Sequence, residues 1–488
     1  MKKILLGILV LLLAFIAVLF GRAFLASSQQ SEYALIDLPP LDQQSIENFQ
    51  EAIQIPTLSH GYTIPTDTAS FYQFHDTLAS NYPLVDSFLT RETIADLSLL
   101  YTWEGTHAAA KPIVLIGHMD VVPIATPEQW EEDPFSGVVR DGYIWGRGTL
   151  DDKISVVSVL EATERLLAQG FQPGRTIYFA FGHDEEIGGY GAQALAKALK
   201  QRGVEAEFVL DEGGVVTDGL VPGIDDYVAV VSIAEKGYMT VRMEVLLEEG
   251  GHSSMPPKET STEILSRAVV SIRDNQPSTM MAEPTKMMFE YLGAEMAFPY
   301  NLVFVNQDIL APIVPGILAG TSPSGNATVR TTTSPTVLKA GIKDNILPTK
   351  ATALVNFRLL PGNSSEEILA HLREVVDDER VTIEPIPGTV VYEASVVSST
   401  ESFGFSTIDR AIKEVFDSTL VAPNLSVGYT DVRQYQGVSS DLYRFLPFHA
   451  TSEDLARIHG TNERLSLKDY QRGIAFYEQV IRHGSQAQ

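Results

Sequence analysis

The segment FAFGHDEEIGG, residues 179–189, ends an apolar run with two adjacent glutamates, Glu185 and Glu186. With the preceding TIY, the apolar residues form the short continuous run that is typical of a buried parallel strand. Adjacent carboxylates cost little in a solvated loop, but at the end of a buried strand they repel each other and lose hydration. A cation or a shared proton would offset that cost. The segment therefore predicts a buried sheet with an acidic site at the end of one strand.

Two further apolar runs end in the same way, with polar residues that can do chemistry. These residues are His118 and Asp120 after PIVLIG (112–117), and Asp211 after EFVL (207–210). Amphipathic helical patterns alternate with the runs, over residues 154–170 and 191–203. This order predicts an α/β domain around a largely parallel sheet. In such a sheet the carboxyl ends of the strands form the edge where ligands bind.

A glycine-broken turn, WGRGTLDDK (145–153), adds Asp151 and Asp152 between the first two strands. One histidine and several carboxylates therefore converge on one sheet edge, where their repulsion requires cations. Imidazole nitrogen and carboxylate oxygen are ligands of hard and borderline divalent metals. The chain has no cysteine, so a metal site must be built from His, Asp and Glu. We expect one glutamate of the adjacent pair to ligate a metal while its neighbour acts as a base.

Past residue 234 the pattern changes to that of a smaller α+β domain. Strand and helix patterns follow in the order β-α-β-β-α-β, over residues 237–248, 261–272, 336–345, 349–360, 364–376 and 380–386. That order is typical of a ferredoxin-like domain. Helical patterns of the first domain return after about 396. We therefore predict a catalytic domain in two parts, 46–233 and 396–488, with a domain inserted at 234–395. The pattern predicts no structure for residues 276–335.

The N-terminus carries a signal peptide or a signal anchor over residues 1–26, followed by a polar linker over 27–45. Two lysines precede an unbroken apolar run from Ile4 to Phe20, and Arg22 closes it. The run is longer than the apolar core of most signal peptides and just long enough to span a bilayer. We interpret it as an uncleaved anchor that leaves the catalytic domain outside the cytoplasm, in a periplasmic, extracellular or lumenal position. The alternative is a secreted enzyme.

The charge of the chain excludes one class of partner. Its 488 residues carry a formal net charge of −27. A surface that binds nucleic acid needs clustered Lys and Arg, so we expect no nucleic-acid partner.

Six segments occur in a familiar order: GHMDVVP, GRGTLDDK, GHDEEIGG, LDEGG, GGHSSMP and HGTNER. Together they resemble the M20 family of metallopeptidases and deacylases, and most of all its carboxypeptidase S and N-acyl amino acid hydrolase branch. The resemblance extends from about residue 46 to the C-terminus. It implies an α/β zinc-hydrolase domain with an inserted ferredoxin-like lid. It also implies two divalent metal ions, usually zinc, bridged by Asp151. His118 and Asp211 would complete the ligands of one ion, and Glu186 and His459 would complete those of the other.

The resemblance assigns further roles around this centre. Asp120 would orient His118, and Glu185 would be the general base. The peptide bond after the bridging aspartate, Asp151–Asp152, is often cis in the family.

In the inserted domain, His252 would polarise the scissile carbonyl, in some members from the neighbouring subunit. Arg358 would hold the carboxylate of the substrate, and Asn345 would lie near the same place. The inserted domain would also be the surface of a homodimer, as in many members of the family.

These roles imply hydrolysis of an amide bond next to a free α-carboxylate. The first reading is a carboxypeptidase or dipeptidase that acts on short peptides. The alternative is an N-acyl amino acid hydrolase, which could also run in the direction of synthesis. A third reading, a catalytically inactive binding protein of the same fold, would be favoured by a missing ligand or base. Every residue of the six motifs that the resemblance requires is present.

Overall fold

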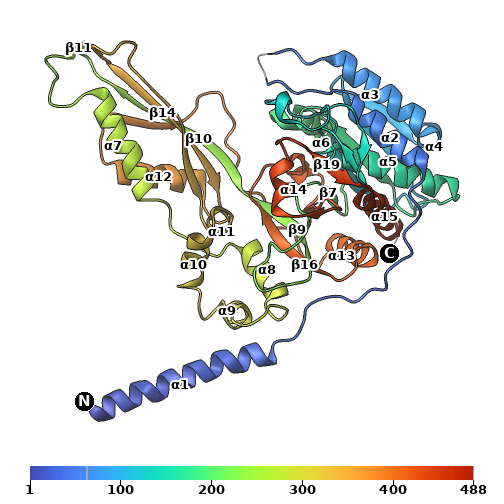
Figure 1. Ribbon diagram of the computed structural model, residues 1–488, viewed down its shortest axis with the longest axis horizontal. Helices are drawn as coiled ribbons and strands as arrows, with labels where there is room; N and C mark the ends of the chain where they lie inside the picture. The colour runs from blue at the N-terminus through green and yellow to red at the C-terminus, as the bar shows by residue number, and fades with distance from the viewer. Residues whose placement is uncertain (62–63, 487–488) are drawn as a thin grey trace.

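The computed structural model describes residues 1–61 and 64–486, and arranges them as two domains and a separate helix (Figure 1). The large domain, on the right in Figure 1, is a sheet covered by helices. The inserted domain, on the left, is a smaller sheet with two helices on it. A single long helix, α1 (Lys2–Leu25), projects from the base of the molecule.

A ten-stranded sheet forms the centre of the large domain. Its four middle strands, β6, β3, β7 and β17, run parallel to one another, which confirms the largely parallel sheet expected from the apolar runs. In spatial order the strands are β1 (Thr90–Ile94), β2 (Ser98–Trp103), β6 (Ile177–Gly182), β3 (Ile113–His118), β7 (Val209–Asp211), β17 (Leu442–Arg444), β9 (Tyr227–Glu235), β8 (Val216–Thr217) and β18 (His449–Ala450), with β16 (Thr419–Ser426) paired to β9.

Helices cover both faces of this sheet, which is why its middle strands are apolar without alternation. On β3, Ile113 and Leu115 join one apolar cluster while Val114 and Ile116 join another on the opposite face. The first cluster lies under α5 (Lys153–Ala168), which packs against α15 (Leu467–Gly484). The second lies under α6 (Tyr190–Gln201). The large domain also contains α2 (Gln43–Gln54), α3 (Thr68–Asn81), α4 (Pro83–Phe88), α13 (Phe403–Val415) and α14 (Ser452–Arg457).

The inserted domain has the predicted ferredoxin-like order. Its elements along the chain are β10 (Gly237–Leu246), α7 (Ser261–Asp274), β12 (Thr332–Ala340), β14 (Lys350–Leu359), α12 (Ser365–Val376) and β15 (Val381–Pro385). In space the strands lie in the order β12-β14-β10-β15, and every neighbouring pair is antiparallel. Burial alternates along β10 and β14, as expected for a sheet with one face covered by α7 and α12.

Residues 276–335, for which the sequence pattern predicts no structure, contain four short helices. They are α8 (Glu283–Leu292), α9 (Tyr300–Phe304), α10 (Val314–Thr321) and α11 (Pro323–Val329). α8 packs on β16 and β9 of the large sheet, and the rings of Phe289 and Phe304 stack with centroids 3.8 Å apart. Although these helices lie within the predicted insertion of 234–395, α8, α9 and α10 share an apolar cluster with the large domain.

The N-terminal segment consists of α1 and an extended stretch. Within the described residues, α1 is the helix that is long and apolar enough to cross a membrane, with a mean hydropathy of 3.2, although a signal sequence has the same properties. The stretch predicted as a linker is bound along the large domain. Gln30 exchanges hydrogen bonds with the backbone of Val421 (2.8 and 3.0 Å), and the N–H of Ile36 donates to the carbonyl of Glu414. α2 begins at Gln43, two residues before the predicted linker ends.

Candidate active site

Asp151 lies between two groups of side chains. Its Oδ1 is 2.9 Å from Nε2 of His118, and the same nitrogen is 3.5 Å from Oε1 of Glu212. Its Oδ2 is 3.0 Å from Nε2 of His459, which is 3.1 Å from Oε2 of Glu186. In each group the potential ligand atoms all lie within 4.8 Å of one another. One aspartate therefore offers one oxygen to each of two adjacent groups.

Sheet topology brings three of these side chains together. His118 is the last residue of β3, Glu212 directly follows β7, and Glu186 lies in a short 3-10 helix, η2 (Glu185–Ile187), just after β6. Because β6, β3 and β7 are parallel neighbours, their carboxyl ends meet at one edge. This is the convergence that the polar residues after each apolar run predicted.

His459 reaches the site from the far end of the sequence through a second, smaller sheet. β19 (Arg464–Ser466), just beyond it, pairs antiparallel with β5 (Tyr143–Trp145), with Arg464 opposite Trp145. The turn that carries Asp151 follows β5 directly. The pairing thus places the HGTNER segment beside the GRGTLDDK segment, although they are more than three hundred residues apart in the sequence.

Glu212, the residue after Asp211, lies in the group that contains His118 and Asp151. The Asp211 carboxylate accepts a hydrogen bond from the N–H of Val432 (2.8 Å) and belongs to neither group around Asp151. Glu212 is the residue that approaches His118. The physical reason is the alternation of side chains at the end of β7, where successive residues point to opposite sides. Both residues occur in LDEGG, and the sequence alone does not reveal which of the two faces the site.

Glu463 is a site residue that the sequence analysis did not single out. It is fully buried, and its Oε1 accepts hydrogen bonds from the N–H groups of Gly148 (3.0 Å) and Leu150 (2.8 Å). It also forms an ion pair with buried Arg147. This carboxylate fixes the turn that presents Asp151, and its place within HGTNER was the available indication. The Asp151–Asp152 peptide bond is cis, as the resemblance implies.

Asp120 connects His118 with the adjacent glutamates. Its carboxylate lies 3.2 Å from Nδ1 of His118, whose other ring nitrogen faces Asp151. It accepts hydrogen bonds from Ser59 Oγ (2.7 Å) and from the N–H groups of Glu185 (3.1 Å) and Glu186 (3.2 Å). Burial alone would raise the pKa of Asp120, but the hydrogen bond and charge of His118, together with the hydrogen bonds from Ser59 and the Glu186 N–H, outweigh it and the pKa is lowered. Asp120 thus orients the His118 ring and holds the backbone of the two glutamates.

The site is rich in buried negative charge. Burial raises the pKa of Glu185 well above its ordinary value, and the nearby carboxylates of Glu212 and Asp431 add to the effect. Burial, followed by the charge of Asp151, raises the pKa of Glu212 to about 8. Hydrogen bonds to Asp151 and Glu186 raise the pKa of His459 to about 10. Each of these shifts arises because buried carboxylates are crowded together in this centre.

The donor set fits a pair of divalent cations. Each group supplies one imidazole nitrogen and two carboxylates, with Asp151 common to both, and this mixture suits borderline metals. Oε1 of Glu186 is buried and has no hydrogen-bond partner among the described residues. Such an oxygen costs free energy unless a cation or a proton partners it. The residues present are therefore suitable ligands for two metal ions.

His252 and Asn345 lie together but far from this centre in the same chain. His252 is in β11 (Gly251–His252), which pairs antiparallel with β13 (Ile346–Leu347) in a separate two-stranded sheet at the distal end of the inserted domain (Figure 1). The carbonyl of Asn345 accepts a hydrogen bond from the N–H of Ser253 (3.2 Å). The His252 side chain is exposed. Within one chain, the structure does not bring these two residues to Asp151.

Arg358 lies at the opposite end of the inserted domain, next to the large domain. It is near the end of β14 and opposite Tyr238, and its guanidinium lies 4.9 Å from the centre of the Tyr238 ring. Its Nη1 is buried without a hydrogen-bond partner among the described residues. Eight residues of extended strand separate Arg358 from Lys350, which is about 26 Å. Asn345 precedes Lys350, so the prediction that Asn345 lies near Arg358 is wrong within a single chain.

A second arginine connects Arg358 with the acidic centre. Arg433 lies in η3 (Asp431–Gly437) and forms an ion pair with buried Glu235. Burial lowers the pKa of Arg358; Tyr238 opposes this effect and the positive charge of Arg433 adds to it. The residue before Arg433 is Val432, whose N–H donates to Asp211. The short helix η3 therefore lies between Arg358 and the end of β7, because its Arg433 is close to Arg358 and its Val432 binds Asp211.

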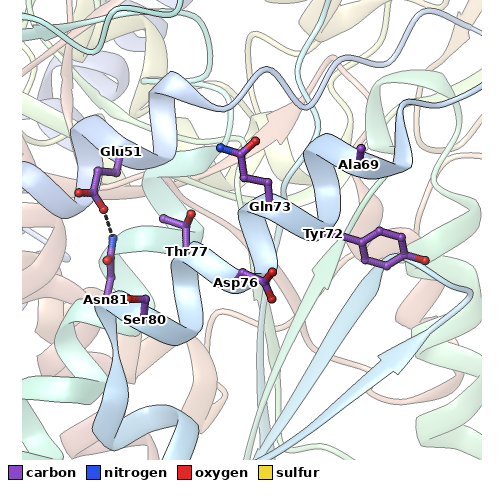
Figure 2. A pocket seen from close by; sticks show the side chains of 8 residues that line it. All are labelled: Glu51, Ala69, Tyr72, Gln73, Asp76, Thr77, Ser80 and Asn81. Carbon is purple, nitrogen blue, oxygen red and sulfur yellow. Dashed lines mark hydrogen bonds between the residues drawn. The ribbon is translucent and has the colours of Figure 1, made fainter.

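A separate hollow between α2 and α3 contains none of this chemistry. Figure 2 shows its lining, in which the side chains of Asn81 and Glu51 form a hydrogen bond of 3.0 Å. The other lining residues are Ala69, Tyr72, Gln73, Asp76, Thr77 and Ser80. None of them belongs to the six motifs, so the candidate active site remains the sheet edge around Asp151.

Comparison with known proteins agrees with the six motifs. The model of peptidase family M20/M25/M40 matches residues 114–483. The chain belongs to this family. The result confirms the predicted family and the prediction of an M20-type hydrolase.

Two relatives of this M20 chain represent the two activities expected from its sequence. It is 39% identical over 447 residues to "Probable carboxypeptidase S-like 2" of Dictyostelium discoideum, a match that covers 91% of this chain and 85% of that protein. It is 40% identical over 493 residues to "N-fatty-acyl-amino acid synthase/hydrolase PM20D1" of Xenopus tropicalis, covering 99% and 95%.

The M20 fold is also found among solved structures. The M20 family metallo-carboxypeptidase Sso-CP2 from Sulfolobus solfataricus superimposes with a TM-score of 0.66 at 16% identity, covering 91% of this chain and 100% of that one. Human carnosine dipeptidase 1 superimposes with a TM-score of 0.62 at 15% identity, covering 91% and 96%. These likenesses confirm the predicted fold, an α/β domain with an inserted α+β domain.

Proposed function

We propose that this M20 protein is a dinuclear metallohydrolase that cleaves an amide bond next to a free α-carboxylate. The observation that carries the proposal is the position of Asp151, whose two carboxylate oxygens each face a separate group of one histidine and one glutamate. His118 and Glu212 would hold one ion with Asp151, and His459 and Glu186 the other. We expect zinc, because the donors are imidazole and carboxylate.

Two cations at this position would supply Lewis acidity, which lowers the pKa of a water molecule and polarises a carbonyl. The other roles in the reaction belong to side chains of the protein. Glu185 would take the proton from the attacking water and deliver it to the leaving nitrogen. Its carboxylate belongs to neither group around Asp151, while its backbone is fixed by Asp120. Burial raises its pKa, which makes it a stronger proton acceptor than an exposed glutamate.

Arg358 would select substrates that end in a carboxylate. A guanidinium can pair two-pronged with a carboxylate, and its planar fork fixes the orientation of the partner. The buried Nη1 of Arg358 has no hydrogen-bond partner among the described residues, and the nearby Glu235 is engaged by Arg433 and Arg444. Arg358 is thus a half-buried cation with capacity for an added carboxylate.

His252 and Asn345 would act from a second copy of the chain. Both are at the distal end of the inserted domain, away from the Asp151 of their own chain. A symmetric dimer formed through this domain would bring each distal two-stranded sheet to the partner's acidic centre. There His252 would donate to the substrate carbonyl as negative charge develops on it.

Co-expression of two inactive variants tests this arrangement. We expect H252A and E185Q to be inactive alone and to recover about one quarter of wild-type activity together, since half of the dimers would be mixed and each would hold one intact site. The measurement is turnover of the co-purified mixture. H371A, which changes a partly exposed histidine elsewhere in the inserted domain, is the control partner and should itself be active. Absence of recovery in purified mixed dimers would place His252 outside the active site.

The two candidate ligands in LDEGG can be separated by substitution. We expect Glu212→Gln to reduce the metal content from two ions to one per chain, because it removes a carboxylate that faces His118. Asp211→Asn should keep both ions, because Asp211 accepts a backbone N–H instead. Elemental analysis of the two purified variants gives the answer. Loss of metal in Asp211→Asn with retention in Glu212→Gln would reverse the assignment.

The substrate class follows from what occupies the acyl side of the scissile bond. We propose short peptides as substrates, with N-acyl amino acids as the second candidate, because a relative that is 40% identical bears the name of an N-fatty-acyl-amino acid synthase/hydrolase. A matched panel of dipeptides and long-chain acyl amino acids with the same C-terminal residue decides between them. The metal-loaded full chain should cleave one series at least tenfold faster in kcat/KM. Cleavage of neither series by the metal-loaded enzyme would overturn the proposed reaction.

We further propose that α1 remains attached and anchors the enzyme with its large domain outside the cytoplasm. Its apolar run, flanked by Lys2 and Lys3 on one side, is the supporting observation. Recovery of the full-length chain in the membrane fraction is expected. N-terminal sequencing of the mature protein that begins near Ser27–Gln30 would instead indicate a processed, secreted enzyme.

A further inference from the structure

We propose that Arg433 is a second substrate-binding residue, and that the carboxylate of the substrate is held between Arg433 of the large domain and Arg358 of the inserted domain. This inference rests on the proposed function, in which Arg358 binds the carboxylate, and it deepens that function by adding a partner from the other domain. The two domains meet where β9 continues into β10 (Figure 1). One carboxylate bound by both arginines would therefore tie the domains together across this junction.

Two paired tyrosines bring the arginines together. The N–H of Tyr238 donates to the carbonyl of Tyr392 (2.7 Å), and the N–H of Tyr392 donates to the carbonyl of Tyr238 (2.9 Å). The guanidinium of Arg358 lies 4.9 Å from the centre of the Tyr238 ring, and that of Arg433 lies 4.8 Å from the centre of the Tyr392 ring. Because the side chains of residues paired in this way lie next to each other on one face, the two guanidinium groups are neighbours.

The guanidinium of Arg433 is fixed in place with one nitrogen left over. Its Nε donates to Oε1 of Glu235, and its Nη2 donates to the carbonyl of Lys236 (3.4 Å). The rings of Tyr392 and Tyr429 pack against it, with their centres 4.8 and 4.7 Å away. Its Nη1 is buried and has no hydrogen-bond partner among the described residues. A buried N–H donor without an acceptor costs free energy, so an added anion at this nitrogen would be stabilising.

The charges around the two arginines do not balance. Glu235 is fully buried, and its Oε1 pairs with Arg433 while its Oε2 pairs with Arg444 (2.9 Å). The hydroxyl of Thr430 also donates to Oε2 (3.0 Å), so both oxygens of Glu235 are engaged. Nη1 of Arg358, like that of Arg433, is buried without a hydrogen-bond partner in the part of the chain that the structure describes. Like charges held close together repel each other, and a carboxylate between Arg358 and Arg433 would reduce that repulsion.

The helix that carries Arg433, η3, also contacts the strand ends at the acidic centre. The N–H of Val432 donates to Asp211 at the end of β7 (2.8 Å). The carboxylate of Asp431 is buried over Gly182 at the end of β6, where an added Cβ would lie 2.7 Å from its Oδ2. Arg433 thus belongs to the short helix that touches the ends of β6 and β7. A carboxylate bound there is close to the sheet edge where the amide bond would be cleaved.

A double-mutant cycle on matched substrates tests this inference. Arg433→Lys and Arg358→Lys are made singly and together in the metal-loaded full chain. The measurement is kcat/KM for the free-acid and amidated forms of one substrate, taken from the series of the panel that the enzyme cleaves faster. We expect Arg433→Lys to lower kcat/KM for the free acid about tenfold or more, because a lysine keeps the charge but lacks the planar fork. The amidated form should change less than about twofold.

The double variant shows whether the two arginines share one carboxylate. We expect it to lose clearly less than the product of the two single losses, since each substitution disrupts the same bound group. Losses that multiply would mean separate roles and would overturn the shared site. A native enzyme that prefers the free acid, together with an Arg433→Lys variant that keeps this preference in full, would overturn the role of Arg433 and leave the proposed function standing. A native enzyme without the preference would overturn both.

Arg444→Lys is the matched structural control. Arg444 is fully buried and pairs with Glu235 as Arg433 does, but it lies on β17 opposite Asp211. We expect this variant to lower the melting temperature without changing the ratio of kcat/KM for the free acid to that for the amide. An equal fall of the ratio in Arg444→Lys and Arg433→Lys would attribute the effect to the contacts of Glu235 and contradict the inference.

Tyr392→Leu provides the test if Arg433→Lys does not fold. This substitution leaves the backbone pairing with Tyr238 and the ion pair of Arg433 with Glu235 in place, and removes one ring that orients the guanidinium. We expect a loss of about threefold in kcat/KM for the free acid, in line with the strength of one cation–π contact. The amidated form should be unaffected. The same loss on both forms, or no loss on the free acid, would overturn the assignment of Arg433 to the substrate carboxylate.

Discussion

Replacing Glu185 by glutamine is expected to lower turnover by about three to four orders of magnitude, while the protein keeps its fold and its metal ions. Glutamine has the size of glutamate but cannot accept the proton of the attacking water. The hydrogen bond that fixes this residue comes from its backbone N–H to Asp120, and the substitution leaves it intact. Turnover, metal content and circular dichroism measured on one preparation would provide the result.

The adjacent residue offers a matched control. Glu186→Gln makes the same chemical change one position further on, but Glu186 faces His459 and Asp151. We expect this variant to lose one metal ion, whereas Glu185→Gln should lose none. Near-normal turnover of Glu185→Gln with its metal intact would exclude Glu185 as the base. Loss of metal in Glu185→Gln would make it a ligand instead.

Replacing Arg358 by lysine is expected to lower kcat/KM for free-acid substrates by about one to three orders of magnitude. A lysine keeps the positive charge but cannot form the two-pronged pair with a carboxylate. Substrates whose carboxylate is amidated or esterified should already be poor for the native enzyme, and the substitution should harm them far less. Measuring both substrates on both proteins isolates the pairwise interaction.

Arg242 on β10 is the matched control for Arg358. It lies on the neighbouring strand of the same sheet, where it pairs with Glu384 at the surface. Arg242→Lys should therefore leave both substrates unaffected. If the native enzyme cleaves blocked substrates as fast as free acids, Arg358 has a structural role and the enzyme is a general amidase. The two-metal proposal would survive that outcome.

The sheet and its acidic edge could be predicted because they depend on local patterns. The runs before His118, Glu185 and Asp211 are continuously apolar, and helical periods separate them, so a parallel sheet with polar strand ends follows. The order of the inserted domain was equally local, since each of its strands and helices has its own period. These features need no knowledge of distant contacts.

Side-chain direction and distances between elements could not be predicted from such patterns. Asp211 and Glu212 are adjacent, and only the register of β7 with β3 determines which one faces His118. The resemblance implied that Asn345 lies near Arg358, but within one chain Asn345 precedes the far end of β14 from Arg358. The helices of 276–335 had no clear period because they are short, and tertiary packing on β16 determines their position.

The position of β17 has a consequence for how the enzyme comes into existence. This strand, Leu442–Arg444, lies between β7 and β9 in the large sheet, and His459 follows it. A growing chain that has been synthesised only as far as the inserted domain therefore lacks both the strand that joins the two halves of the sheet and one side of the acidic centre. Translation must be almost finished before the site can assemble. A nascent chain that has not reached His459 is thus unable to hydrolyse an amide at this centre.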